Sequence, residues 1–455
     1  MDAVALQSLV AELGGRCNGP RVMVTGVGID SRSLVKGDLF VALPGDQADG
    51  HDFVSAAAAA GASAVMVSRE VDTDLPQWVV EDTRRSLVEL ACWIRSQSQA
   101  LTVGITGSNG KTTVKEMVSA ILQEVGPTHA SKGNFNNELG VPLTLCGLNA
   151  EHQYAVVEMG CARPGDISLL ASWVRPRVGL VNNVGPAHLA GFGSVSAIAA
   201  GKGELFEALP AEGCAVINAD DPFASFWEQQ AAHCHILRFS LEGLPADVVG
   251  SISENNQLQI QLPEHPQSFE VRVPLPGRHN QLNALAATSV AAAMDIPVDA
   301  IVRGIENVAA VAGRLVATPG IAGSELIDDT YNANPASLTA AMQTVSTQYD
   351  GPVWLVLGDM AELGPEAEAL HTAAGREARA LGFKRLYALG PLSAHAAEAF
   401  GENAACFDDH DALIKVLTDA LGKGVRVLVK GSRSSRMERV VMALSDSADA
   451  GGQSC

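Results

Sequence analysis

The sequence predicts an α/β protein with three domains, and three observations support this prediction. Its 455 residues exceed what one hydrophobic core usually organises. Residues 313–455 alternate between apolar strands and helical stretches, which is typical of a mostly parallel, Rossmann-like sheet. After residue 100, a β-branched strand runs through a glycine turn into an amphipathic helix. We therefore divide the chain into segments 1–84, 85–312 and 313–455.

Local patterns place the elements of the first and last segments. In the first, "GDLFVALPG" predicts a strand entering a Pro-Gly turn, and "HDFVSAAAAAGASAVMVS" predicts a helix that ends near Gly61 before another strand. In the last, apolar runs predict strands at Glu325–Ile327, Val353–Leu357, Arg385–Leu389 and Val425–Val429. Helical stretches between these runs give the alternation of a βαβ protein.

Composition and charge narrow the classes of partner. The mix of 47% hydrophobic and 18% charged residues is ordinary for a globular protein. A formal net charge of −20 argues against non-specific nucleic-acid binding, although local cationic groups can still hold an anionic substrate. No apolar run approaches the roughly 18 residues that span a bilayer, and the start lacks a basic signal-peptide region. We expect a cytoplasmic monomer without a membrane span.

The stretch "GITGSNGKTT", residues 104–113, has the features of a phosphate-binding loop. It follows the strand "LTVGIT" and precedes a helix whose apolar residues share one face. Gly107 and Gly110 allow the backbone to curl around a phosphate, and the helix start offers free N–H groups. Lys111 supplies a positive charge, and Thr112 can place its hydroxyl on Mg²⁺. The loop is the short form G-x-x-G-K-T, because position 105 is Ile; a chance glycine-rich turn is the alternative.

Polar residues at strand ends suggest a metal near this loop. Glu158 ends the apolar strand "YAVVEMG", and His188 lies just beyond the strand in "VGLVNNVGPAHL". Ligands of open parallel sheets sit at the carboxyl ends of the strands, so these two side chains and Thr112 form a plausible Mg²⁺ environment. Lys202, in "AAGKGELF", is expected at the start of a helical stretch, where composition alone favours a solvated lysine.

The set of motifs resembles the Mur ligases, the ATP-dependent amide-forming enzymes of peptidoglycan synthesis. The central-domain stretches are "GITGSNGKTT", "GNFNNELGVPLTL", "VVEMG", "NVGPAHL" and "GKGELF". The first segment adds "DSRSLVKGDLFVALPG" and "DGHDF", which resemble the UDP-binding domain of the family. The last segment contributes "DDTYNANPAS", "LGDMAELG" and "VKGSRSSRME". These resemble the member that joins D-alanyl-D-alanine to UDP-N-acetylmuramoyl-tripeptide.

This resemblance implies a small α/β UDP-binding domain, a central P-loop-type ATPase domain with a mostly parallel sheet, and a C-terminal Rossmann-like domain. It implies catalytic roles for Lys111, Glu158, His188 and Lys202. The implied ATP-binding residues are Gly107, Ser108, Asn109, Gly110, Lys111, Thr112, Thr113, Asn280, Asn283, Arg314 and Asp328. The implied substrate-binding residues are Ser31, Arg32, Asn134, Asn137, Tyr331, Asn332, Asn334, Lys430, Ser432 and Arg433. Two Mg²⁺ ions would lie near Thr112, Glu158, His188 and a Lys202 carbamylated by CO₂.

The implied reaction activates a carboxylate with ATP as an acyl phosphate, which the amine of D-alanyl-D-alanine then attacks. Another Mur-type amino acid ligase, a folylpolyglutamate synthetase, a small-molecule kinase and a nucleotide-gated switch are the alternatives. The "DSR" and "DGHDF" stretches argue against the folylpolyglutamate enzyme, and the motif order argues against the kinase and the switch. The sequence leaves open whether the tripeptide ends in meso-diaminopimelate or L-lysine.

Overall fold

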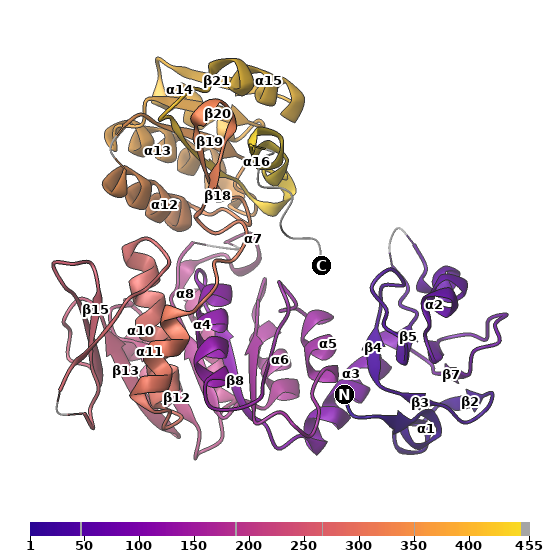
Figure 1. Ribbon diagram of the computed structural model, residues 1–455. Coiled ribbons are helices and arrows are strands. Elements are labelled where there is room, and N and C mark those ends of the chain that lie inside the picture. The colour runs from indigo at the N-terminus through magenta and orange to yellow at the C-terminus, as the bar shows by residue number, and fades with distance from the viewer. Residues whose placement is uncertain (46–47, 187–188, 266, 350, 447–455) are drawn as a thin grey trace.

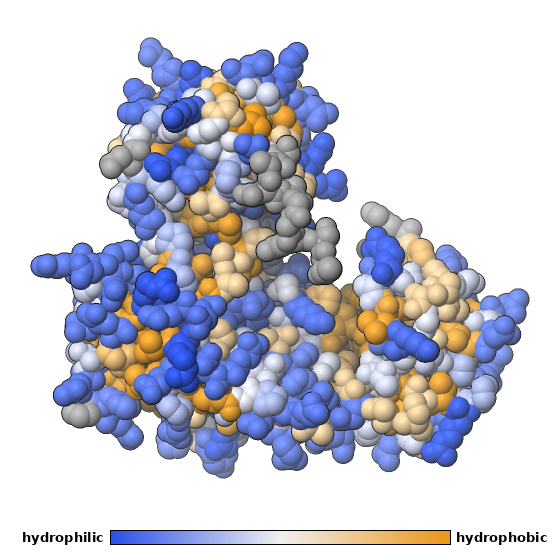
Figure 2. Space-filling view, in the orientation of Figure 1, coloured by the Kyte–Doolittle hydropathy of each residue, from blue (hydrophilic) through white to orange (hydrophobic). Residues whose placement is uncertain are grey.

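The computed structural model describes five stretches of the chain: 1–45, 48–186, 189–265, 267–349 and 351–446. Three large sheets form, and the strands of each come from one of the three segments predicted above. Figure 1 shows the first and third sheets, with their helices, adjoining different sides of the central body. Figure 2 shows the surface hollowed above the central body, between the other two. The predicted α/β class is confirmed.

The first sheet has five strands in the order β2-β7-β6-β5-β4, parallel except for the edge strand β2. Its strands are β2 (Arg16–Asn18), β4 (Gly26–Gly28), β5 (Asp38–Val41), β6 (Ala64–Val67) and β7 (Gln77–Val79). Around it lie the pair β1 (Val4–Ala5) and β3 (Met23–Val24) with the helices α1 (Leu6–Leu13), η1 (Gly50–Phe53) and α2 (Val54–Ala60). As predicted, α2 ends at Gly61, whose φ of 97° is left-handed and suits glycine.

Helix α3 (Thr83–Gln97) joins the first body to the central one. Asp82 caps its first turn by accepting hydrogen bonds from two backbone N–H groups. The helix packs against α5 (Gly140–Cys146) and α6 (Asp166–Val174), so one apolar cluster continues from the first sheet into the central body. The limit placed between residues 84 and 85 falls inside this helix. The limits at 84 and 312 remain our proposal for dividing the chain.

The central sheet has nine strands in the order β16-β15-β14-β13-β12-β11-β8-β10-β9. Strands β8 to β14 are parallel, and β15 and β16 extend the sheet in antiparallel fashion. The bounds are β8 (Leu101–Thr106), β9 (Thr128–Ala130), β10 (Tyr154–Glu158), β11 (Val178–Val181), β12 (Cys214–Asn218), β13 (His235–Ser240), β14 (Val248–Ile252), β15 (Leu258–Gln261) and β16 (Phe269–Val271). Parallel strands place their carboxyl ends, and the residues that follow them, along one edge.

Helices cover both faces of this sheet. One face carries α4 (Lys111–Gln123), α10 (Arg278–Ala292) and α11 (Val298–Glu306). The other carries α5, α6, α7 (Leu189–Phe192), α8 (Val195–Glu207) and α9 (Ala224–Gln230). Because both faces of the sheet are buried, the sequence of β8 is a continuous β-branched and apolar run, as predicted. None of the helices in the described part of the chain has the length and apolar character that crossing a bilayer needs.

The third sheet has six strands in the order β17-β18-β22-β19-β20-β21, all parallel except β17. Its strands are β17 (Val316–Pro319), β18 (Glu325–Asp329), β19 (Val353–Gly358), β20 (Arg385–Leu389), β21 (Ala404–Phe407) and β22 (Arg426–Lys430). The helices are α12 (Pro335–Gln348), α13 (Ala367–Ala380) and α14 (Ser393–Phe400) on one face, and α15 (His410–Ala420) and α16 (Glu438–Leu444) on the other. The four strands predicted for this segment are present, with ends within two residues of the prediction.

Candidate active site

The phosphate-loop motif forms the turn between β8 and α4. Gly110 has a φ of 79° and precedes the first residue of α4. A Cβ atom there would collide with the side-chain amides of Asn182 and Asn283, so both the conformation and the space require glycine. The first turn of α4 therefore presents its free N–H groups and its positive dipole end at the carboxyl edge of the sheet, which suits an anion.

Asparagine side chains hold the loop in this shape. Asn183 accepts the Asn109 N–H at 2.9 Å through its side-chain oxygen. Asn182 donates to the Asn109 carbonyl at 3.1 Å and to the Asn283 side chain at 2.9 Å, and Asn283 in turn donates to Asn280. The two asparagines expected to contact the nucleotide, Asn280 and Asn283, are thus tied from α10 to the loop itself.

Lys111 lies at the start of α4 and curls back over the loop. Its ammonium group donates to the Gly107 carbonyl at 2.7 Å. Burial, together with the nearby Lys202 ammonium, lowers the pKa of Lys111 to about 8. A cation that has lost hydration and faces another cation gains from an anionic ligand, and this is the electrostatic condition expected beside a phosphate.

Glu158 ends β10 at the same edge of the sheet and is 1% exposed. Its Oε1 atom accepts a hydrogen bond from the Asn136 amide at 2.7 Å. Its Oε2 atom is buried and has no hydrogen-bond partner among the described residues. A buried carboxylate oxygen without a donor is costly unless a ligand completes it. Glu158 thus fits one side of a cation site.

Lys202 differs from the expectation of a solvated lysine at a helix start. It lies in the middle of α8 and is 2% exposed. Within the described part of the chain, its ammonium group contacts the Cys161 thiol at 3.4 Å and has no carboxylate partner. No cluster of three or more His, Cys, Asp or Glu side chains that could hold a metal forms among the described residues. The predicted His188 lies outside the described residues.

Two side chains of the third body reach across to the phosphate loop. Arg314 donates to the Thr112 hydroxyl at 2.9 Å, and its guanidinium stacks 4.3 Å from the Tyr331 ring centre. Asn334, the N-cap of α12, donates to the Asn109 side-chain oxygen at 2.7 Å. These contacts place the third body directly over the loop. The nucleotide role implied for Arg314 and the substrate role implied for Asn334 remain predictions.

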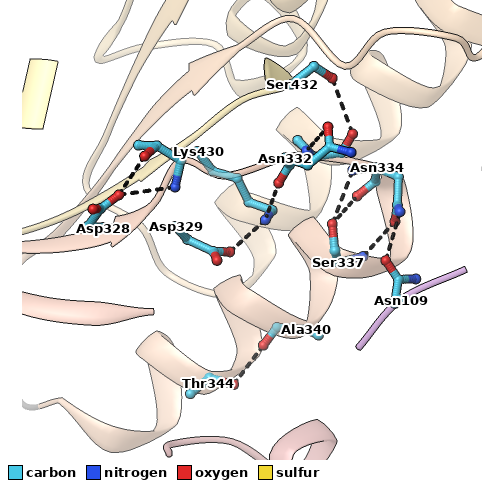
Figure 3. A network of polar contacts seen from close by, with 12 residues as sticks. Asn109, Asp328, Asp329, Asn332, Asn334, Ser337, Ala340, Thr344, Lys430 and Ser432 are labelled. Carbon is cyan, nitrogen blue, oxygen red and sulfur yellow. Dashed lines mark hydrogen bonds and ion pairs between the residues drawn. The ribbon is translucent and has the colours of Figure 1, made fainter. Parts of the chain in front are cut away.

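A network of polar contacts fixes the wall of the third body, as Figure 3 shows. Lys430, at the end of β22, donates to Asp329 at 2.6 Å and to the Asn332 carbonyl at 2.9 Å. Asn334 and Ser337 form a capping box at the start of α12. The backbone that presents Asn332 and Asn334 is thus anchored from two sides.

One cavity of about 940 Å³ brings most of the predicted residues together. The predicted residues that line it are Ser108, Asn109, Gly110, Lys111, Thr112, Thr113, Asn134, Asn137, Glu158, Asn280, Asn283, Arg314, Tyr331, Asn332, Asn334, Lys430 and Arg433. Gly107 lies behind it, bonded to Lys111, and Lys202 lies under it beside the lining residue Cys161. The cavity is large enough for a nucleotide and part of a second substrate.

Four other predicted residues do not line this cavity. Asp328 turns away, since its carboxylate accepts from the Thr330 N–H and hydroxyl; its neighbour Asp329 lines the cavity instead. Ser432 is buried and braces the wall by donating to the backbone and accepting from it. Ser31 and Arg32 lie in the first body, where Arg32 is exposed and pairs with Asp30.

Sequence reasoning missed several residues of the cavity. These are Arg84, Asn136, Cys161, Arg163, His279 and Asp329. Asn136 lies inside "GNFNNELG", between two predicted residues, and its contact with Glu158 joins positions 22 residues apart. Burial, aided by the charge of Lys430, lowers the pKa of His279 to about 4, so this ring is neutral at pH 7. No single residue or short motif predicts such contacts, because they join segments that are far apart in the sequence.

The motif order has a counterpart in known proteins. Family models for three Mur ligase parts match residues 23–93 (catalytic domain), 105–291 (middle domain) and 313–433 (glutamate ligase domain). The UDP-N-acetylmuramoyl-tripeptide–D-alanyl-D-alanine ligase of Escherichia coli strain K12 is 43% identical over 455 residues, which span 98% of this chain and 99% of that protein.

Solved structures agree with this match. MurF from Acinetobacter baumannii superposes with a TM-score of 0.86 at 33% identity and covers 97% of this chain and 98% of that one. MurF ligase from Thermotoga maritima, solved in complex with ADP, superposes with a TM-score of 0.78 at 28% identity and covers 92% and 97% of the two chains. With the motifs, the cavity and these similarities in agreement, the chain belongs to the Mur ligase family.

Proposed function

We propose that this ligase joins D-alanyl-D-alanine to UDP-N-acetylmuramoyl-tripeptide, consuming ATP and releasing ADP and phosphate. The observation that carries the proposal is the single cavity in which the phosphate loop, Glu158 and the third-body residues Arg314 and Asn334 meet. Similarity to the E. coli ligase and to an ADP-bound MurF supports the substrates and the nucleotide. We place the reaction in the cytoplasm, where ATP is regenerated.

The loop side of the cavity would hold the nucleotide. The first turn of α4 and the Lys111 ammonium face the β- and γ-phosphates, and Arg314 adds a second cation from the third body. Asn280 and Asn283 stand behind the loop on α10 and support the nucleotide site. These fixed charges neutralise the charge that develops as the γ-phosphoryl group is transferred.

The residues also fit Mg²⁺. Thr112 and Glu158 would hold it, with His188 and a carbamylated Lys202 as further ligands. Glu158 fits because its buried Oε2 atom has no partner within the described chain, and Lys202 fits because a carbamate would replace a buried cation with an anion. When bound, Mg²⁺ supplies charge neutralisation between the phosphates and the reacting carboxylate.

Amide formation requires an oxygen of the substrate's carboxylate to leave, and this oxygen is a poor leaving group until it is phosphorylated. One oxygen of the substrate's terminal carboxylate attacks the γ-phosphorus, and ADP leaves; the resulting acyl phosphate is then attacked by the dipeptide amine, and phosphate leaves with that oxygen. The protein orients the reactants and excludes water. Asn134 and Asn137 would contact the sugar–peptide part, and Ser31 and Arg32 the UDP part.

The incoming dipeptide would bind at the wall of the third body. Tyr331, Asn332 and Asn334 present polar groups there, and Arg433 adds positive charge suited to the dipeptide's carboxylate. Lys430 would act on this substrate through the wall, because its charge is paired with Asp329 and it holds the Asn332 carbonyl. Ser432 braces this wall. We propose that the enzyme acts as a monomer, because one chain brings both walls of the cavity together.

The direct test supplies the enzyme with ATP, Mg²⁺, UDP-N-acetylmuramoyl-tripeptide and D-alanyl-D-alanine. Mass spectrometry should show the pentapeptide product, with multiple turnovers of ATP to ADP only when both substrates are present. Tripeptides ending in meso-diaminopimelate and in L-lysine are compared in parallel. A stable phosphorylated product that accumulates over many turnovers without the dipeptide would favour the kinase alternative, and another amino acid as preferred acceptor would favour a different Mur-type ligase.

A further inference from the structure

Asn136 occupies an unusual position beside the acidic residue of the cavity. It lies in the segment 131–139, which leads from β9 to α5 and crosses the end of β10. Its amide Nδ2 donates to Glu158 Oε1 at 2.7 Å. The amide nitrogen is the only side-chain donor of asparagine, and the Glu158 oxygen accepts from it.

This single hydrogen bond leaves the two carboxylate oxygens of Glu158 in different states. Oε1 is satisfied by Asn136, whereas Oε2 is buried without a partner among the described residues. A donor on one oxygen fixes the rotation of the carboxylate plane and directs the other oxygen to one place. Glu158 and Asn136 both line the cavity, so a cation bound at this place would lie beside the carboxylate.

The backbone around Asn136 is itself anchored on both sides of Glu158. The Asn136 carbonyl accepts the Gly160 N–H at 2.7 Å, two residues beyond Glu158. The Ser131 hydroxyl accepts the Glu158 N–H at 3.1 Å, and buried Lys115 donates to the Ser131 carbonyl at 2.7 Å. One main-chain hydrogen bond and one to the Ser131 hydroxyl therefore hold the segment against the strand end, so the Asn136 side chain meets the Glu158 carboxylate in a fixed geometry.

Gly160 leaves room for this arrangement. A Cβ atom on Gly160 would lie 3.1 Å from the Asn136 side-chain oxygen, closer than ordinary packing allows. The glycine thus lets the amide pack flat against the strand exit while its nitrogen faces Glu158. Neutral asparagine also suits this role better than a cation, because a cation would compete with a metal ion for the same carboxylate.

We propose that Asn136 is a positioning residue, whose amide orients Glu158 so that Oε2 faces a divalent cation. The inference rests on the Mg²⁺-dependent ATP chemistry proposed above and assigns a part to a residue with no implied role so far. Donors to a ligating carboxylate fix its direction, and losing such a donor typically weakens metal binding by about 10- to 100-fold.

The test measures metal binding rather than turnover. Mn²⁺ is titrated into the enzyme with a saturating non-hydrolysable ATP analogue, and free Mn²⁺ is followed by electron paramagnetic resonance against a nucleotide-only blank. Asn136→Ala should bind Mn²⁺ about 10- to 100-fold more weakly than the native enzyme. Phe135→Leu, in the same segment but exposed and outside the cavity lining, should leave Mn²⁺ binding unchanged. Unaltered Mn²⁺ affinity in Asn136→Ala would overturn the proposal.

A double-mutant cycle with Glu158→Ala separates positioning from a general loss of structure. If Asn136 acts through Glu158, adding Asn136→Ala to Glu158→Ala causes no further weakening of Mn²⁺ binding. Equal weakening in both backgrounds would contradict it. Asn136→Ser, which is smaller and cannot reach Oε1, repeats the test should the alanine variant unfold. Because no amide product is measured, failure here is distinct from failure of the ligase assay.

Discussion

Two buried lysines near the cavity have opposite surroundings. Lys430, in the third body, donates to Asp329 and to the Asn332 carbonyl, so its charge is paired. Lys202, in the central body, contacts only a thiol among the described residues. Both are 2% exposed. An unpaired buried charge is unfavourable. We therefore assign Lys430 to the structural framework, and we expect Lys202 to be paired only after it is modified or a ligand binds.

The same contrast extends to the two walls of the cavity. The third-body wall is braced by the contacts of Figure 3, which involve Asn334, Ser337 and Lys430. The central wall has a buried oxygen without a partner among the described residues, Oε2 of Glu158, and its Lys111 has a lowered pKa. In the third-body wall the buried charges of Lys430 and Asp329 are paired, and Arg314 Nε is buried without a partner among the described residues. We call the third-body wall, with its paired charges, the complete wall, and the central wall, whose carboxylate oxygen and lysine await ligands, the incomplete wall.

The largest expected effect is on stability, at the complete wall. Lys430→Met leaves the Asp329 carboxylate buried without its cation, and breaking such a pair typically costs about 3–5 kcal/mol. Chemical denaturation should therefore show a clear loss of unfolding free energy. The double variant Lys430→Met/Asp329→Asn removes both charges and should recover part of that loss. If the single and double variants are equally unstable, the ion pair is not what holds this wall.

At the incomplete wall, Lys111→Ala should affect turnover rather than folding. The γ-phosphoryl group would lose its nearest fixed cation, and loss of one preorganised group of this kind lowers kcat by about 100- to 1,000-fold. Thermal unfolding without ligands should stay near that of the native enzyme, since burial makes this cation unfavourable in the empty site. If Lys111→Ala were strongly destabilised, Lys111 would have a structural role rather than a catalytic one.

Lys202→Ala should lose about 10- to 100-fold in activity if a carbamate on this lysine supports Mg²⁺. Added formate or acetate should restore part of the activity, because a short carboxylate fits the vacated space. Lys202→Arg is the matched control: it keeps the positive charge, cannot form a carbamate, and should be inactive without rescue. Near-normal turnover of Lys202→Ala would rule out the assignment.

Nucleotide binding should weaken above pH 8. The pKa of Lys111 is about 8 in the free enzyme when Lys202 is an unmodified ammonium, so the experiment uses CO₂-free buffer. Only the ammonium form of Lys111 attracts phosphate, so affinity falls by up to about tenfold per pH unit above that value. Calorimetry with a non-hydrolysable ATP analogue from pH 7 to 9.5 would show it, and Lys111→Arg should give a flatter profile. A flat profile in the native enzyme would contradict the lowered pKa.

The same pKa predicts how the free enzyme's stability responds to pH. The folded-state pKa lies below the unfolded value of 10.5, so the unfolded chain binds more protons between about pH 8 and 10.5. The contribution of Lys111 to stability therefore rises with pH across that window. The slope of unfolding free energy against pH should be smaller in Lys111→Met.

Sequence patterns predicted the features that depend on local order. The strand, glycine turn and helix around Gly110 and Lys111 follow from local periodicity, and Glu158 follows from the end of an apolar strand. Lys202 was placed wrongly at a helix start, because the pattern "AAGKGELF" does not show that α8 begins at Val195. The first residue of a helix depends on its capping interaction, and the N-cap of α8 is Ser194. Composition alone does not show where that cap lies.

Contacts between distant segments could not be predicted in this way. Asp328 and Asp329 differ by one position on β18, and side chains alternate along a strand, so only the register of the sheet decides which faces the cavity. The bond from Asn136 to Glu158 depends on how a loop crosses a strand end. The bond from Arg314 to Thr112 joins residues 202 positions apart and depends on how two bodies pack.

The central claim is that the incomplete wall serves to activate a carboxylate. The most direct measurement labels the terminal carboxylate of UDP-N-acetylmuramoyl-tripeptide with heavy oxygen and follows the label by mass spectrometry during turnover with ATP and D-alanyl-D-alanine. The oxygen that attacks the γ-phosphorus leaves with it, so the released phosphate should carry the label as the pentapeptide forms. Unlabelled phosphate alongside genuine pentapeptide would contradict the acyl-phosphate account.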